Sequence, residues 1–135
     1  MATITSNPVK RRKIKTDVIA AATTLTAATS GTSYDLTAAA GAAVTLPALE
    51  AGLNFRFVVG SAFATTDWTI VSSTNVINGN VLVAGAHVAG ASENTISFVA
   101  SAESVGDYVD VYCNGTLWFA SGSGVTTGSI TFTAP

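Results

Sequence analysis

The side chains that could take part in catalysis are few, and they have no partners of the right kind nearby. Glu103, Asp107 and Asp110 lie close together in the sequence, but they flank a turn and a strand and have no histidine or metal partner. The single histidine, His87, cannot form a metal site alone, and we expect it on a surface loop. The segment Ser121–Gly124 lacks the strand-to-helix turn and the base that a nucleophilic serine needs. We therefore predict a protein that is not an enzyme and that has no cofactor and no metal site.

Two further residues with useful chemistry have simple structural interpretations. The single cysteine, Cys113, excludes an intramolecular disulfide and a zinc site built from several cysteines, and we expect a buried thiol. Arg56 is the only basic residue after Lys15, whereas all eight acids come after Lys15. We expect Arg56 to form a surface ion pair with one of these acids, and a ligand contact is the alternative.

Charge is distributed unevenly along the chain. Five of the six basic residues form one N-terminal run, which consists of Lys10, Arg11, Arg12, Lys13 and Lys15. The sequence from residue 17 onward carries one basic and eight acidic residues, a net charge of −7. We predict an extended basic arm over residues 1–16, which at about 50 Å could reach a neighbouring molecule. We expect it to dock on an acidic protein surface, and a solvated tail or a nucleic-acid tether is the less favoured alternative.

The elements that must position any site are expected to be β-strands, and the clearest are in residues 106–122. Asn114-Gly115 separates two apolar runs, which favours a type I′ turn with these two residues at its tip. In that register, Tyr112 is opposite Leu117. Side chains alternate between the two faces of a strand, and here both faces are apolar. One face carries Val109, Val111, Cys113, Trp118 and Ala120, and the other carries Tyr108, Tyr112, Leu117 and Phe119.

The second apolar face of this hairpin needs a cover. An apolar patch of this size is rarely left open on a monomer. We therefore predict that the chain forms a homo-oligomer, specifically a trimer. Its interface is predicted to contain Tyr108, Tyr112, Leu117 and Phe119. The alternative is that a second sheet of the same chain covers this face.

The rest of the chain consists of short alternating runs between Gly, Asn and Pro turns. Strands are predicted over residues 17–22, 33–37, 43–46, 53–59, 67–71, 94–100 and 129–133. A second Asn-Gly pair, Asn78-Gly79, predicts another hairpin between residues 76–77 and 81–84, and residues 85–93 are predicted to form a loop. This pattern indicates an all-β fold, an antiparallel β-sandwich or a jelly-roll-like barrel. We expect one such domain over residues 17–135, preceded by the extended arm.

The apolar stretch after the basic run does not have the character of an export signal or a membrane span. Asp17 and several threonines interrupt it. No run reaches the roughly 18 apolar residues of a membrane-spanning helix. We therefore expect no membrane partner and no export signal.

The order of these elements resembles a group of small structural proteins encoded by tailed bacteriophages. The resemblance is carried by TLTAATSGTSYDLTAAAGAAVTLPALEAGLNFRFVV, then DWTIVS, then GDYVDVYCNGTLWFASG, which together span roughly residues 24–122. These motifs consist of turn and core residues. This sequence has Thr29-Ser30-Gly31 where an acidic residue often precedes Ser-Gly in that group. The resemblance implies a virion protein on the outer surface of the capsid, a head decoration or cement protein whose partner is the major capsid protein.

Two classes of function therefore remain. The first is the cement protein, and the second is a fibre- or tail-associated or carbohydrate-binding β-sandwich module. Exposed aromatic residues distinguish them. A sugar site would present Trp68, Trp118 or tyrosines as an open platform, whereas a cement protein would bury them in its core and in subunit contacts.

Overall fold

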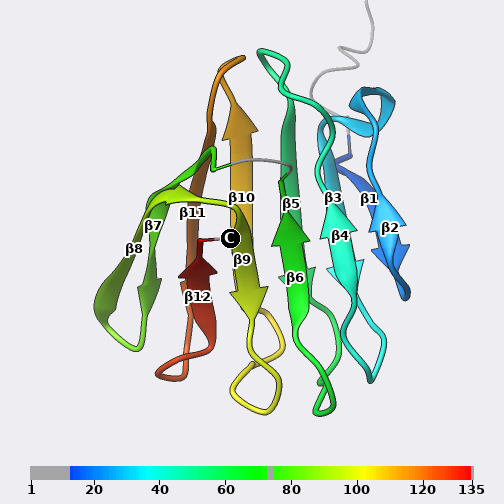
Figure 1. The fold of residues 1–135 in the computed structure, drawn as a ribbon. Coiled ribbons are helices and arrows are strands. Elements are labelled where there is room, and N and C mark those ends of the chain that lie inside the picture. The colour runs from blue at the N-terminus through cyan, green and yellow to red at the C-terminus, as the bar shows by residue number, and fades with distance from the viewer. Residues whose placement is uncertain (1–12, 73–74, 135) are drawn as a thin grey trace, which may run out of the picture.

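The protein is described by a computed structural model that covers residues 13–72 and 75–134. In this part of the chain, two β-sheets lie face to face, and one 3-10 helical turn, η1 (Ala27–Thr29), connects two strands (Figure 1). The seven-stranded sheet has the order β1 (Lys15–Ile19), β3 (Thr32–Leu36), β5 (Asn54–Val59), β10 (Tyr108–Cys113), β11 (Trp118–Gly124), β7 (Ile77–Val83) and β8 (Ala86–Glu93). The five-stranded sheet has the order β12 (Ile130–Thr133), β9 (Thr95–Phe98), β6 (Trp68–Val71), β4 (Ala43–Thr45) and β2 (Thr23–Thr24). The predicted all-β sandwich is confirmed.

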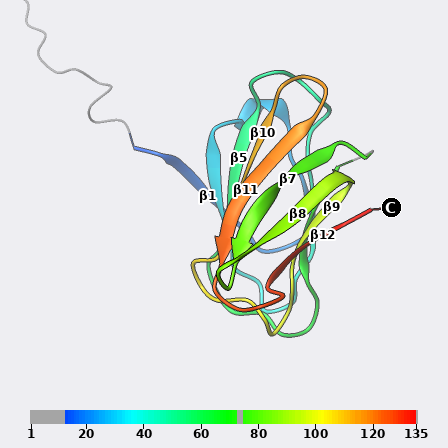
Figure 2. The same cartoon turned by 90° about the vertical axis from the view of Figure 1, so that its left-hand side faces the viewer.

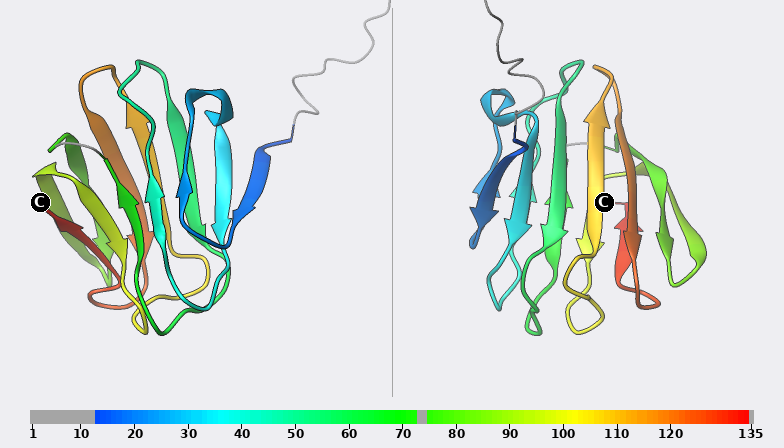
Figure 3. Two further views of the ribbon diagram at one scale, coloured as in Figure 1. Left: turned by 45° about the vertical axis from the view of Figure 1, so that its right-hand side comes forward. Right: turned by 180° about the vertical axis from the view of Figure 1, so that it is seen from behind.

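The sheets are mixed rather than purely antiparallel. From β1 to β7, each successive strand lies in the other sheet, so strands that return to the same sheet run in the same direction. As a result, β1, β3 and β5 pair in parallel, and so do β2, β4 and β6. Antiparallel hairpins appear only later along the described chain, as β7–β8 and β10–β11. Figure 3 shows the seven-stranded sheet in front when the molecule is viewed from behind.

The core lies between the two sheets and follows the alternation of the strands. In β5, Phe55, Phe57 and Val59 are buried, whereas Asn54 and Arg56 are exposed. Trp68 from the five-stranded sheet and Trp118 from the seven-stranded sheet are both fully buried. Fully burying one large apolar side chain contributes about 1.5–3 kcal/mol, so these residues fix which face of each strand is inside.

The β10–β11 hairpin forms, but its turn lies one residue later than predicted. Gly115 and Thr116 form the tip, and Tyr112 pairs with Phe119 rather than with Leu117. Gly115 has a φ of +103°, while Thr116 stays outside the positive-φ region, so the turn is not of type I′. The Oδ1 atom of Asn114 accepts hydrogen bonds from the backbone N–H groups of Thr116 and Leu117, both at 2.9 Å. Moving the turn by one residue shifts the cross-strand partner of each residue by two positions. Because a shift of two positions preserves the alternation, every side chain keeps its predicted face.

The second predicted hairpin is wrong in position. Asn78-Gly79 lies inside β7, next to a bulge in its pairing with β8, and the turn falls at Ala84-Gly85. Both turn residues have positive φ, 50° and 81°, as a type I′ turn requires. The predicted loop over residues 85–93 is instead strand β8. Gly79 is needed where it is because the backbone of β11 passes very close to it.

Candidate functional site

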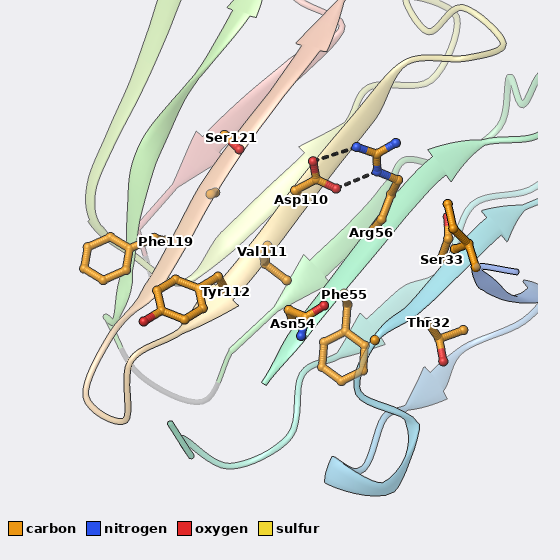
Figure 4. Close-up of a pocket in the computed structure, with 13 residues that line it drawn as sticks. Thr32, Ser33, Asn54, Phe55, Arg56, Asp110, Val111, Tyr112, Phe119 and Ser121 are labelled. Carbon is orange, nitrogen blue, oxygen red and sulfur yellow. Dashed lines mark hydrogen bonds and ion pairs between the residues drawn. The ribbon is translucent and has the colours of Figure 1, made fainter. Parts of the chain in front are cut away.

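The outward face of the seven-stranded sheet carries the main candidate site. A hollow of about 510 Å³ lies over β3, β5, β10 and β11 and reaches Ile14, the residue directly before β1. Across these strands the pairing places Arg56 next to Asp110, and Asp110 next to Ser121. The neighbouring row consists of Asn54, Tyr112 and Phe119. Figure 4 shows these two rows, with the polar pair at the centre and the two aromatic rings at one end.

A fixed ion pair lies at the centre of the hollow. Arg56 donates from Nε to Oδ1 of Asp110 at 2.6 Å and from Nη2 to Oδ2 at 2.9 Å. The ring of Tyr108 lies 4.7 Å from the guanidinium carbon and supports its flat face. The hydrogen bond to Asp110 raises the pKa of Arg56 above its usual value, against a smaller opposing effect of desolvation. The surface ion pair predicted for Arg56 is therefore confirmed, and the partner is Asp110.

Next to this pair lies an open aromatic platform. Tyr112 and Phe119 face each other across β10 and β11, with ring centroids 6.1 Å apart and an angle of 22° between the rings. Their exposed fractions are 50% and 39%. The other two residues of the predicted oligomer interface, Tyr108 and Leu117, are half-buried. These four residues do lie on the outward side of one hairpin, and their role as an interface stays a prediction.

A second candidate surface is the free edge of β1. This strand is the last of its sheet and pairs on one side only, with β3. Ile14 and Val18 are 75% and 56% exposed there, and Lys15 and Lys13 are also exposed. Figure 2 shows β1 at the margin of the sandwich. The remaining residues of the predicted arm contact, Lys10, Arg11 and Arg12, lie outside the described residues. Strand β1 begins at Lys15, inside the range predicted as arm.

The acids considered for catalysis have structural partners. Glu103 accepts a hydrogen bond from the backbone N–H of Phe63 at 2.8 Å. Buried Asp107 accepts hydrogen bonds from the backbone N–H groups of Ser104 at 2.9 Å and Val125 at 3.1 Å. These carboxylates hold loops together. In residues 13–72 and 75–134, no three His, Cys, Asp or Glu side chains come together as a metal site would require.

His87 and Cys113 are placed as follows. His87 is exposed as predicted, but it lies on β8 rather than on a loop, with its Nδ1 atom 3.2 Å from Oδ1 of Asn80. Cys113 is a free thiol and is buried, as predicted. The sequence prediction missed Asn54 and Ser121 as parts of a site. The alternation in each strand was the available signal, since it places Asn54 beside Arg56 on the outward face.

Comparison with protein-family models, with curated proteins and with solved structures finds no match to this chain. Among the described residues, no helix is long and apolar enough to cross a membrane.

Proposed function

We propose that this protein is a capsid decoration, or cement, protein that binds the major capsid protein on the outer surface of a virion and stabilises the shell. The observation that supports this proposal best is the free edge of β1. It is directly continuous with the basic N-terminal run, and the edge itself carries two exposed apolar side chains, Ile14 and Val18. An exposed strand edge with apolar side chains is a ready template for pairing with another chain.

The charge distribution adds to this argument. The described residues from Asp17 onward are strongly acidic, whereas the sequence up to Lys15 is basic. The basic run is therefore better suited to an acidic surface on a partner than to a dry core. Single exposed ion pairs contribute about 0–1 kcal/mol, and several on one segment would act together. A symmetric oligomer, for which we propose a trimer, would multiply this attachment through avidity.

The second candidate is a module of a fibre or tail. The buried positions of Trp68 and Trp118 remove the two largest aromatic rings from the surface. The exposed pair of Tyr112 and Phe119 is the observation that favours this candidate. The two candidates differ in where the chain would lie on a particle, at many positions on the head or at few positions on the tail.

The test is a binding experiment with capsids that lack this chain. Purified protein is added at rising concentration, the capsids are sedimented, and bound copies per capsid are counted. We expect saturation at a high copy number, and at least a tenfold weaker affinity for the double variant Ile14→Asp and Val18→Asp. Val125→Asp is the matched control, because Val125 is 72% exposed and lies outside both surfaces. A lack of binding by the unmodified protein would contradict the proposal, and equal binding by the double variant would remove the role of β1.

A further inference from the structure

We propose that the hollow on the outward face of the seven-stranded sheet is a binding site for a neutral carbohydrate. In this site, Tyr112 and Phe119 form the stacking platform, and Arg56 with Asp110 forms the hydrogen-bonding pair. The platform and the ion pair lie on β5, β10 and β11, and the hollow shares only Ile14 with the free edge of β1 proposed to attach to a capsid.

The platform has the geometry that a sugar ring needs. Pyranose rings have an apolar face of C–H groups, which packs against aromatic rings. Tyr112 and Phe119 are 22° from parallel and lie side by side, so together they offer a larger apolar surface than one ring. They are half-exposed although both are large and aromatic, and open apolar surface of this kind indicates a binding site.

The polar pair is held in place before any ligand arrives. Asp110 fixes the guanidinium of Arg56 within its plane, and Tyr108 supports it from one face. The two hydrogen bonds to Asp110 use two of the five N–H donors of the arginine, and one terminal nitrogen points away from Asp110 (Figure 4). A fixed planar group with free donors and acceptors suits the adjacent hydroxyl groups of a sugar, and preorganisation lowers the entropy cost of binding.

The spacing joins these two parts into one site. Asp110 and Tyr112 are two residues apart on β10 and point to the same side, which separates them by about 7 Å. A sugar that stacks on the platform would therefore present its hydroxyl groups to the pair. Asn54 lies opposite Tyr112, and Ser121 lies opposite Asp110, so further polar side chains surround the same ring.

The charges decide the class of carbohydrate. Because the proposal gives Tyr112 and Phe119 to a carbohydrate, it replaces their predicted role as a contact between copies, and the proposed trimer would then form through another surface. Among the described residues, Arg56 is the only basic one that lines the hollow, and Asp110 neutralises it. An anionic polysaccharide or a nucleic acid would find no surplus positive charge there. Aspartate is depleted at the centre of protein–protein interfaces, although arginine is enriched there, and Asp110 lies at the centre of this hollow.

The test uses a printed array of neutral and acidic oligosaccharides, including bacterial surface polysaccharides. We expect the full chain to bind at least one neutral glycan. Tyr112→Ala and Arg56→Ala should each weaken that binding at least tenfold, whereas Tyr112→Phe should retain it. Leu82→Ala is the matched control, since Leu82 is 43% exposed on the same sheet and does not line the hollow. Thermal melting of each variant checks that it is folded.

Analytical sedimentation of the same variants distinguishes a carbohydrate from a second copy of this chain as the occupant of the hollow. We expect Tyr112→Ala to leave the oligomeric state unchanged. The proposal is overturned if the unmodified chain binds no neutral glycan, if it binds only acidic ones, or if the folded variants bind as well as the unmodified chain. It is also overturned if Tyr112→Ala dissociates an oligomer, because the platform would then be the contact between copies.

Discussion

The tip of the β10–β11 hairpin depends on two residues with different roles. Asn114 accepts hydrogen bonds from Thr116 and Leu117 through one side-chain oxygen, and Gly115 supplies the positive φ. Both residues belong to the Asn114-Gly115 motif used for the prediction. The prediction placed both of them at the tip, whereas Asn114 precedes the tip. A side chain that caps the turn from the position before it gives no separate signal in the sequence, because an Asn-Gly pair fits either arrangement.

Substitutions at this tip should separate the two roles. We expect Gly115→Val to lower the free energy of unfolding by about 1–3 kcal/mol, because a β-branched residue is strained at this φ. We expect Asn114→Ala to lower the free energy of unfolding by about 1–2 kcal/mol, because the hydrogen-bond acceptor is lost. Asn114→Asp keeps an acceptor oxygen and should therefore retain most of the stability of the unmodified protein. Urea denaturation measures all three variants. Equal stability of Asn114→Ala and Asn114→Asp would show that the side-chain oxygen does not hold the turn.

Gly79 makes a second prediction at the residue scale. A Cβ atom at this position would overlap the backbone of Ala120 on the neighbouring strand. We therefore expect Gly79→Ala to lower the free energy of unfolding by about 3 kcal/mol, the upper end of the usual effect of overpacking. Asn80→Ala on the same strand is the control and should change it by less than about 0.5 kcal/mol. Similar melting temperatures for the two variants would contradict the close approach of β7 and β11.

At the scale of elements, the sequence predicts where strands are better than it predicts how they pair. The alternation of Leu53, Phe55, Phe57 and Val59 correctly predicts the buried face of β5. The same turn residues, however, serve both for a hairpin and for a crossing to the other sheet. The segment around Pro47 is such a crossing, since β4 and β5 belong to different sheets. The parallel pairs of the first six strands follow from these crossings, and so they could not be predicted.

Strand β1 gives a prediction at the element scale. Removal of residues 1–12 should leave the free energy of unfolding unchanged within about 0.5 kcal/mol, because every strand of the described sandwich is retained. Removal of residues 1–19 should lower it by several kcal/mol, because it deletes the pairing with β3 and the buried side chain of Ile19. Chemical denaturation of the two truncated proteins compares them. Equal stability would show that β1 is an appendage rather than part of the sheet.

At the scale of the whole molecule, the candidate surfaces were only partly predictable. The aromatic face of the hairpin was predicted from alternation, as was the surface ion pair of Arg56. Its partner Asp110 is 54 positions away in the sequence, and only the pairing of β5 with β10 brings the two together. The hollow that brings Asn54, Arg56, Asp110 and Tyr112 together thus depends on the order of the strands in the sheet. Short-range sequence patterns do not reveal that order.

The charge of the whole molecule predicts a salt effect on attachment. If the basic run meets an acidic partner surface, its contribution should weaken as salt shortens the range of charge interactions to about 3 Å at 1 M. We expect the copies bound per capsid to fall as sodium chloride is raised from 0.05 to about 1 M, and the protein without residues 1–12 to show a smaller fall. Binding that does not change with salt in either protein would show that attachment is apolar.

The composition of purified virus particles shows whether this chain is a decoration protein. The proposal requires that a viral genome carries this gene; particles of that virus are isolated, and the chain is counted against the major capsid protein by quantitative mass spectrometry. We expect a high, fixed copy number on the outer surface of the head, with occupancy greatly reduced in particles whose protein lacks residues 1–12. Absence of the chain from mature particles, or a few copies confined to the tail, would contradict it.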